Sequence, residues 1–240
     1  SGVRMALVTC VTLESVSYHL PDGSSLFTNL DLHIDQRRTG LVGRNGVGKS
    51  LLARLIAGHI SPSTGHCTRS GPVYYLAQHV SPEPGHTVAD LAGVRPVISA
   101  LERIEQGSTE QADFDCIGER WGIRQQLLDQ LAQNNLAHLT PSTPVSALSG
   151  GEAMLVALMG AFLSQADLLI LDEPTNHLDH QHRRALHDQL LNWPNGLLVI
   201  SHDRDVLEHM EVIVELSPMG LTRYGGGFSF YTQAKAEQLH

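Results

Sequence analysis

A glycine-rich loop in the first quarter of the chain has the residue types and the spacing of a phosphate-binding loop. It matches the pattern G-x-x-x-x-G-K-S, and its residues are Gly43, Arg44, Asn45, Gly46, Val47, Gly48, Lys49 and Ser50. Glycines allow a tight turn in which successive backbone N–H groups point at phosphate oxygens. The lysine can reach the β- and γ-phosphates, and the final hydroxyl can ligate Mg²⁺. Because an apolar strand is expected before the loop and a helix after it, we predict a nucleoside triphosphate site.

Two carboxylates follow an apolar run in the second half of the chain. Residues 168–171 predict a buried strand, and Asp172 and Glu173 come directly after it. Ligands of parallel sheets bind at the carboxyl ends of the strands, so both acids are expected beside the phosphate loop. There Asp172 can hold Mg²⁺ directly or through water. Glu173 can polarise a water molecule against the γ-phosphate as a general base.

A serine and a glutamate mark the start of the most apolar helix expected in the chain. Ser149 and Glu152 have the S-x-x-E spacing of a capping box. Gly150 and Gly151 leave the N–H groups of this helix end uncovered, so the end can receive an anion. From this segment alone, an ordinary capped helix is the simpler interpretation.

Composition and charge exclude several classes of protein. The chain has 240 residues, 42% of them hydrophobic, which is enough for a sizeable core. Its formal net charge of −9 argues against a chain that holds nucleic acid by bulk positive charge. The three cysteines are far apart and favour a reducing compartment. No run approaches the roughly 18 apolar residues of a membrane span. A cytoplasmic location without direct membrane insertion is therefore expected.

The pattern of apolar runs predicts an α/β fold. Strands are expected at residues 11–18, 30–34, 39–42, 73–76, 168–171 and 197–200. Helices are expected at 51–57, from 149 onward, and at 180–191. Strands that alternate with helices indicate a mostly parallel sheet.

A helical segment interrupts this alternation. Between residues 88 and 139, apolar residues recur at three- and four-residue steps. The segment carries four arginines and eight carboxylates, a net charge of −4. We therefore expect one domain over 1–240, with a core at 1–87 and 145–240 and a helical insert at 88–144.

Taken together, these segments resemble the nucleotide-binding domain of ATP-binding cassette (ABC) proteins. The resemblance identifies residues 43–50 as the Walker A loop, Asp172 as the Walker B aspartate and Glu173 as the catalytic base. It identifies Tyr18 as the aromatic that stacks on adenine and Gln78 as the glutamine that senses Mg²⁺ and the γ-phosphate. Ser149, Gly150 and Gly151 form the signature. Asp179 is the D-loop aspartate and His202 the switch histidine.

The resemblance implies a fold, cofactors and a partner. The fold is a P-loop core with a mostly parallel sheet, an antiparallel β-subdomain and an inserted α-helical subdomain. The cofactors are ATP and Mg²⁺, with the metal held by Ser50, Gln78 and Asp172. In this family two cassettes pair head to tail, so Ser149 should act on a nucleotide held by the partner cassette. That partner is a second ABC domain, either in the same full-length chain or in a homodimer, and an isolated chain should hydrolyse ATP slowly.

One stretch resembles a particular branch of the family. Residues 173–179 read Glu-Pro-Thr-Asn-His-Leu-Asp and are similar to the ABC-F branch, in which a linker joins two cassettes and many members act on the ribosome. The segment 224–231 resembles the turn and helix that lead into that linker. These features imply the N-terminal cassette of a longer protein, with the ribosome as a candidate partner.

Two other classes of protein share the phosphate-loop motifs. The ATP-hydrolysing subunit of a membrane transporter is the main alternative, and Asn176, His177 and the linker-like tail argue against it. DNA-repair and chromosome-structuring ATPases separate their motifs with long coiled coils, and no sustained heptads occur here.

Other features of the sequence predict what the chain does not do. The acidic insert does not predict RNA docking, and no strong nucleic-acid patch is expected in the segment. After Glu152 the family usually has a basic residue in a Glu-x-x-(Arg/Lys) pattern, whereas residues 153–156 read Ala-Met-Leu-Val here, which predicts a weaker partner contact or an unusually apolar helix face. A metal site is not expected at the histidines near the D-loop, because the H-E-x-x-H spacing is missing from His177, His180, His182 and His187.

Overall fold

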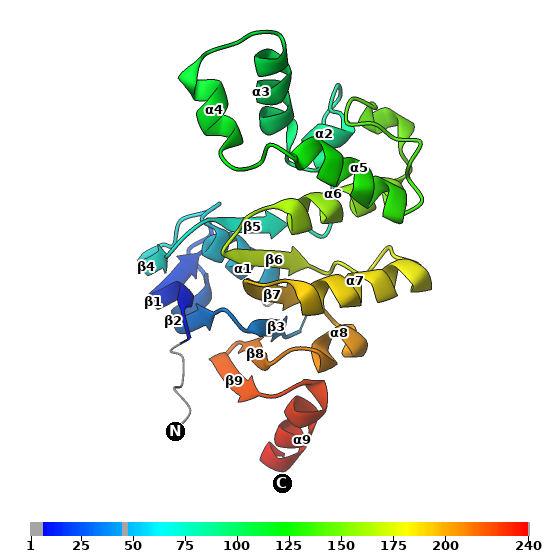
Figure 1. Cartoon of the computed structure of the whole chain (residues 1–240). Helices are drawn as coiled ribbons and strands as arrows, with labels where there is room; N and C mark the ends of the chain where they lie inside the picture. The colour runs from blue at the N-terminus through cyan, green and yellow to red at the C-terminus, as the bar shows by residue number, and fades with distance from the viewer. Residues whose placement is uncertain (1–6, 45–47, 240) are drawn as a thin grey trace, which may run out of the picture. The chain divides into compact units, whose positions relative to one another are not determined.

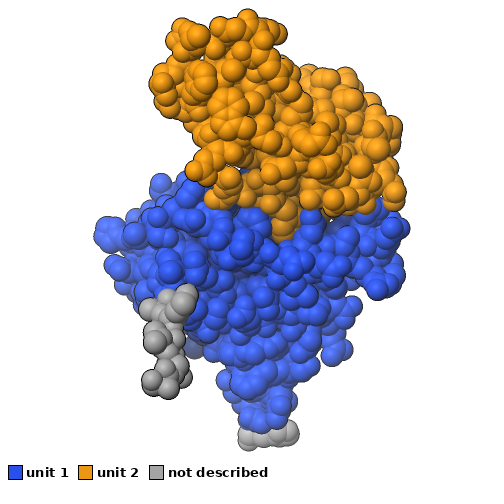
Figure 2. Space-filling view, viewed as in Figure 1, with its two compact units in different colours: residues 1–78, 166–240 blue, residues 79–165 orange. Residues whose placement is uncertain are grey.

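The computed structural model of the protein describes residues 7–44 and 48–239. The chain forms two compact units, which Figure 2 shows in different colours. Unit 1 combines residues 1–78 and 166–240, and unit 2 consists of residues 79–165.

The main sheet of unit 1 is mostly parallel, as the sequence predicts. It has the order β5-β6-β7-β3-β8-β9. The first five strands pair in parallel, and β9 adds an antiparallel edge to β8 (Figure 1). Every residue of β6 and β7 is buried, which is typical of central parallel strands. The strands are β3 (Arg38–Val42), β5 (Val73–Leu76), β6 (Leu168–Asp172), β7 (Gly196–Ile200), β8 (Val212–Ser217) and β9 (Gly220–Gly225).

A second, antiparallel sheet confirms the expected β-subdomain. It has the order β2-β1-β4, with β1 at Thr9–His19, β2 at Ser25–Asp35 and β4 at Thr64–Arg69. Its buried side chains join the core of the main sheet in one hydrophobic cluster. The turn between β1 and β2 uses Gly23 at φ 86°, a conformation that favours glycine.

The described residues of unit 1 also form the helices α1 (Lys49–Ala57), α7 (His180–Asn192), α8 (Arg204–Glu208) and α9 (Phe228–Gln238). The last helix has no buried residue; Tyr231 and Lys235 both bind the carboxylate of Glu215, and the ring of Tyr231 also packs against that of Tyr224. Its position after Gly226 and Gly227 agrees with the turn and helix expected there. No helix within 7–44 and 48–239 is both long and apolar enough to cross a membrane.

Unit 2 is helical and has its own hydrophobic core. Its helix α6 crosses α2 so closely that a Cβ on Gly160 would lie 2.2 Å from the carbonyl oxygen of Ala92. Glycine is therefore required at this crossing. The helices are α2 (Val88–Leu91), α3 (Arg95–Glu105), α4 (Gln111–Ile117), α5 (Ile123–Gln133), the short η1 (Val145–Ala147) and α6 (Gly150–Leu163).

The boundaries of unit 2 differ from those of the helical insert expected at 88–144. Residues 79–87 and 145–165 belong to unit 2. The two ends of the segment are held together, because the N–H of Val88 donates to the carbonyl of Thr143 over 2.9 Å. In addition, Val156 and Met159 of α6 pack in the core of unit 2. Apolar periodicity marks where helices occur, but it does not reveal which core a helix joins.

Candidate functional site

The carboxyl ends of four parallel strands meet at one edge of the main sheet (Figure 1). In the register of the sheet, Leu41 lies beside Ile200, Ile200 beside Asp172, and Leu76 beside Leu171. The segments that leave these strand ends therefore start side by side. They carry four residues that the sequence singles out: Gly43, Gln78, Glu173 and His202.

A chain of hydrogen bonds joins three of the predicted site residues in this region. Nζ of Lys49 lies 3.3 Å from Nε2 of His202, and Nδ1 of the same ring lies 2.5 Å from Oε1 of Glu173. A lysine ammonium can only donate, so Nε2 accepts and Nδ1 carries the proton that it donates to the carboxylate. The geometry thus assigns His202 the neutral tautomer protonated at Nδ1. Residues 153 positions apart in sequence form this contact.

The lysine of the loop is held inside the protein. Lys49 is 8% exposed, and its Nζ also donates to the carbonyl oxygen of Gly43 over 2.6 Å. Burial lowers the pKa of Lys49, and the negative charges of Glu173 and Asp172 oppose that shift. Lys49 belongs to the end of the loop, and its ammonium group is held by the carbonyl of Gly43 at the start of the loop and by the ring of His202.

Glu173 has an unusual backbone conformation. Its φ is +48°, in the left-handed region that residues other than glycine rarely occupy. The residue is 9% exposed, and its backbone N–H donates to the carbonyl of Ile200 over 2.8 Å. Such strain persists only where surrounding contacts maintain it, and it is commonest at functional sites. The turn after β6 directs this carboxylate toward His202.

Asp172 is buried and only half satisfied. Its Oδ2 accepts a hydrogen bond from the hydroxyl of Tyr75 over 3.0 Å. Its Oδ1 is buried without a hydrogen-bond partner among the described residues. Burial, together with the charge of Asp172, raises the pKa of the Tyr75 hydroxyl, which therefore remains a donor. Tyr75 is not among the site residues predicted from the sequence. The apolar run at 73–76 predicts its strand, but only the pairing of β5 with β6 brings its hydroxyl to Asp172.

The described part of the phosphate loop has the backbone that the pattern requires. Gly48 has φ 91°, and a Cβ at this position would lie 2.7 Å from Cδ2 of Leu26. Both observations require glycine immediately before α1. Ser50 is exposed in the first turn of that helix, and Arg44 is exposed before it. Asn45, Gly46 and Val47 were also predicted to bind phosphate and lie outside the described residues.

Two further residues of unit 1 were predicted from the resemblance. Tyr18 lies on β1, half-buried, with its ring centroid 6.3 Å from that of Phe27. Gln78 is half-buried two residues after the end of β5. Neither lies in the hydrogen-bonded chain of Lys49, His202 and Glu173.

The serine–glycine segment belongs to unit 2. Ser149 caps α6 with the predicted capping box: its hydroxyl accepts from the N–H of Glu152 over 3.2 Å, and its own N–H donates to Oε1 of Glu152 over 2.9 Å. That backbone hydrogen bond lowers the pKa of Glu152. A Cβ on Gly150 or Gly151 would meet no atom within 4 Å. The first turn of α6 is therefore open to a ligand.

Replacing Ser149 with Ala should lower the free energy of unfolding by about 1 kcal/mol, because the N–H of Glu152 loses its acceptor. Urea unfolding followed by circular dichroism measures this change. Ser81→Ala, an exposed serine outside any helix, is the matched control. An equal effect of both substitutions would contradict a stabilising role for the capping box.

Asp179 caps the N-terminus of α7. Its Oδ1 accepts from the backbone N–H of His182 over 2.9 Å and lies 2.8 Å from Nδ1 of the same residue. Its side chain is 65% exposed, so much of the carboxylate faces solvent. The cap fixes the backbone of the predicted D-loop where it enters α7.

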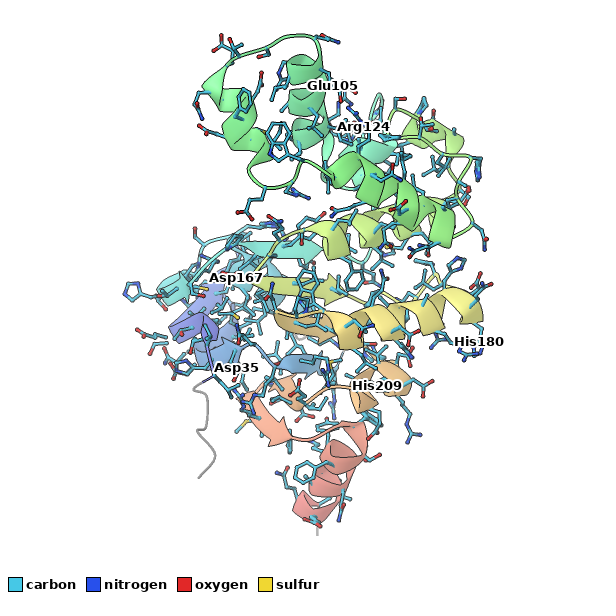
Figure 3. The ribbon with its side chains drawn as sticks, viewed as in Figure 1. Asp35, Glu105, Arg124, Asp167, His180 and His209 are labelled. Carbon is cyan, nitrogen blue, oxygen red and sulfur yellow. The ribbon has the colours of Figure 1, made fainter. Side chains whose placement is uncertain are left out.

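The histidines of α7 do not form a metal centre in the described part of the chain. His180 on α7 and His209 after α8 are labelled in Figure 3, and the His187 ring centroid lies 5.6 Å from that of His209. Across residues 7–44 and 48–239, no group of three or more His, Cys, Asp or Glu side chains is placed to hold a metal ion.

Several proteins of known sequence are similar to this chain. The uncharacterized ABC transporter ATP-binding protein YfmR of Bacillus subtilis is 32% identical over 240 residues, which cover 89% of this chain and 37% of that protein. The energy-dependent translational throttle protein EttA of Mycobacterium tuberculosis is 36% identical over 220 residues, 84% of this chain and 39% of that protein. The ATP-binding protein Uup of Haemophilus influenzae is 32% identical over 240 residues, 89% and 36% respectively. The chain thus spans less than two fifths of the length of these relatives.

Solved structures share the fold. An ATP-binding subunit of an ABC transporter superimposes with a TM-score of 0.73 at 18% identity, covering 95% of this chain and 94% of that one. A dimeric ATP-binding cassette in a post-hydrolysis state with ADP and Pi gives 0.69 at 19% identity, covering 90% and 98%. These matches confirm the predicted P-loop ABC-type α/β fold. Residues 27–176 match the family described as ABC transporter. The chain therefore belongs to the ABC transporter family, as one of its ATP-binding ATPase domains.

Proposed function

We propose that the protein binds Mg·ATP at the carboxyl edge of the main sheet and hydrolyses it with Glu173 as the general base. The observation that carries this proposal is the hydrogen-bonded chain from Lys49 through His202 to Glu173. An ammonium group and a carboxylate contact the two nitrogens of one imidazole ring, which supports a role for Lys49 at the phosphates and for Glu173 at the attacking water.

The residues of this chain have distinct tasks. Nδ1 of His202 donates to Oε1 of Glu173 and so fixes the carboxylate, whose Oε2 can accept a proton from the attacking water. The water attacks the γ-phosphorus in line with the leaving oxygen of ADP. Nζ of Lys49 moves from the carbonyl of Gly43 to the phosphate oxygens and meets the charge that develops on them.

The residues present fit a divalent cation. Oδ1 of Asp172 is a buried acceptor that lacks a partner within the described residues, and a carboxylate oxygen is the ligand that Mg²⁺ prefers. We assign the metal to Asp172, Ser50 and Gln78. When bound, Mg²⁺ would neutralise charge on the β- and γ-phosphates.

Replacing Tyr75 with Phe should weaken the apparent affinity for Mg²⁺ by about 10-fold, because Asp172 loses the hydroxyl that orients it. ATP hydrolysis measured against Mg²⁺ concentration gives this value. Tyr74→Phe is the matched control, since neighbouring residues of a strand point to opposite faces. An unchanged Mg²⁺ dependence in Tyr75→Phe would remove Tyr75 from the site.

We assign Ser149, Gly150 and Gly151 to a nucleotide held by a second cassette, in the same full-length chain or in a homodimer. The open first turn of α6 supports this role, because uncovered N–H groups at a helix N-terminus attract phosphate. Asp179 would lie in the same contact between cassettes. An isolated domain should therefore turn ATP over slowly.

The proposed setting is the ABC-F branch in the cytoplasm, with the ribosome as the partner. Asn176 and His177 support it, as does the name of one relative, a translational throttle protein. The coverage of less than two fifths of each relative leaves room for a second cassette in the full-length protein. The alternative is that the chain is the ATP-hydrolysing subunit of a membrane transporter, which the description of YfmR supports.

Co-sedimentation with ribosomes distinguishes the two settings. The full-length protein with Glu173→Gln should pellet with ribosomes in ATP and remain in the supernatant without nucleotide. Association with a membrane permease and none with ribosomes would support the transporter alternative.

A further inference from the structure

Two aromatic rings are exposed side by side on unit 2. Phe114 lies on α4 and Trp121 in the turn before α5, with ring centroids 5.9 Å apart and an interplanar angle of 57°. Their exposed fractions are 38% and 49%. The other exposed large apolar side chains in the described ranges all belong to unit 1. Aromatic residues are enriched at protein interfaces relative to the rest of the surface.

Ion pairs connect the helices that carry these rings. Arg103 of α3 donates from Nε to Oδ1 of Asp113 over 2.8 Å, next to Phe114 on α4. Arg124 of α5 and Glu105 of α3, both labelled in Figure 3, form an ion pair of 2.8 Å. The rings therefore stand on helices held together by ion pairs, which limits the entropy lost when a partner binds.

The cations of this region are already engaged. Arg103 and Arg124 form the two ion pairs between the helices, and the guanidinium of the half-buried Arg120 donates to the carbonyl of Leu163 over 3.2 Å. All three guanidinium groups thus already have a partner within unit 2.

Three exposed carboxylates are close to the two rings in the sequence. Glu110, Asp115 and Glu119 are exposed and form no ion pair with any residue that the structure describes. Oδ1 of Asp115 accepts a hydrogen bond from Nε2 of Gln111 over 2.8 Å, which leaves its Oδ2 for a partner. Glu110 lies four residues before Phe114, Asp115 follows that ring directly, and Glu119 lies two residues before Trp121. We call these five residues the aromatic–acidic patch.

We propose that the aromatic–acidic patch binds an arginine- or lysine-bearing segment of a partner protein. A guanidinium or ammonium group is attracted to the face of an aromatic ring, most strongly to tryptophan. The three carboxylates can pair with further cations of the same segment, which gives the surface charge complementarity. Nucleic acid is disfavoured, because its phosphates would meet uncompensated carboxylates. The proposal does not depend on ATP hydrolysis, since the patch belongs to unit 2 and Glu173 to unit 1.

Fluorescence anisotropy with a labelled peptide tests the proposal on the chain of 240 residues. The probe is a twelve-residue peptide of alternating arginine and glycine. Binding is measured at several salt concentrations, because the Debye length, ~10 Å at 0.1 M salt, shortens as salt rises. Its control is the same peptide with citrulline, which keeps the shape and removes the charge. We expect the arginine peptide to bind at least about 10-fold more tightly than the citrulline peptide, with affinity that falls as salt rises.

Variants separate the patch from the general acidity of the chain. Trp121→Ala and the triple variant Glu110→Gln, Asp115→Asn, Glu119→Gln should each weaken binding by about 10-fold or more. Trp121→Tyr should retain most of the affinity, since tyrosine also offers a ring face. The matched control is Phe230→Ala, an aromatic residue 54% exposed on α9 of unit 1, which should bind within about twofold of wild type.

Three outcomes would overturn the proposal. The first is equal binding by wild type, Trp121→Ala and the triple variant, all shown to be folded by circular dichroism. The second is equal binding of the citrulline peptide. The third is tighter binding of a single-stranded RNA oligonucleotide than of the arginine peptide, with the same loss in Trp121→Ala, which would assign the rings to base stacking instead.

Discussion

Replacing Glu173 with Gln in the full-length protein should reduce ATP turnover at this site by at least about 100-fold while ATP affinity is retained. The substitution keeps the size of the side chain and the hydrogen bond from Nδ1 of His202, whose acceptor becomes an amide oxygen. It removes the negative charge that would accept the proton from water. Steady-state phosphate release and equilibrium binding of a fluorescent ATP analogue measure the two effects separately.

The chain offers a control for the loss of one carboxylate. Glu83 is a glutamate with an 81% exposed side chain in unit 2, and Glu83→Gln should leave turnover unchanged. Because the Glu173 variant binds ATP without consuming it, a complex of two cassettes should accumulate in ATP and be visible by light scattering. Wild-type turnover in Glu173→Gln would show that another group takes the proton.

The substitution Lys49→Met should weaken ATP binding by about 100-fold, equivalent to ~2.8 kcal/mol. The methionine fills a similar volume but supplies neither the charge nor the donor that now contacts Gly43 and His202. It also leaves Glu173 and Asp172 without the neighbouring cation, so their charges would repel the triphosphate more strongly. Isothermal titration calorimetry with Mg·ATP measures the change.

The matched control for this variant is the other lysine of the chain. Lys235 pairs with Glu215 over 3.1 Å on α9, so Lys235→Met removes the same charge from the surface. It should leave ATP affinity within about twofold, because an exposed charge is largely screened. An equal loss in the two variants would mean that net charge, and not the position of Lys49, governs binding.

Local patterns predicted the parts of the site that the nearby backbone determines. The glycine loop before α1 and the acids after β6 each follow an apolar strand, and a strand end fixes where the next residues begin. The capping box of Ser149 and Glu152 was predictable for the same reason, since both partners lie within one turn of helix.

Contacts between distant strands could not be predicted in this way. The pairing of Lys49 with His202 depends on the register of β3 beside β7, and that of Tyr75 with Asp172 on β5 beside β6. Strands β4, β8 and β9 were not predicted either. Strand β4 is polar, and it is stabilised by pairing with β1. The Val-Ile-Val run of β8, by contrast, is typical of a strand and could have been recognised.

Exposure is a further property that the sequence left open. Trp121 could be recognised as an aromatic residue of the insert, but its 49% exposure and its contact with Phe114 depend on the packing of α3, α4 and α5. The acidic balance of the insert could be counted directly. Only the structure shows that the cations of that region are engaged in internal contacts.

The most direct test of the nucleotide site is a crystal structure of the Glu173→Gln protein grown with ATP and Mn²⁺, a cation whose anomalous scattering marks its position. We expect one anomalous peak beside Oδ1 of Asp172 and the hydroxyl of Ser50, with Nζ of Lys49 turned from Gly43 to the phosphates. Ser149 should contact only a nucleotide bound by another cassette. A peak away from Asp172, or ATP bound without contact to Lys49, would contradict this account.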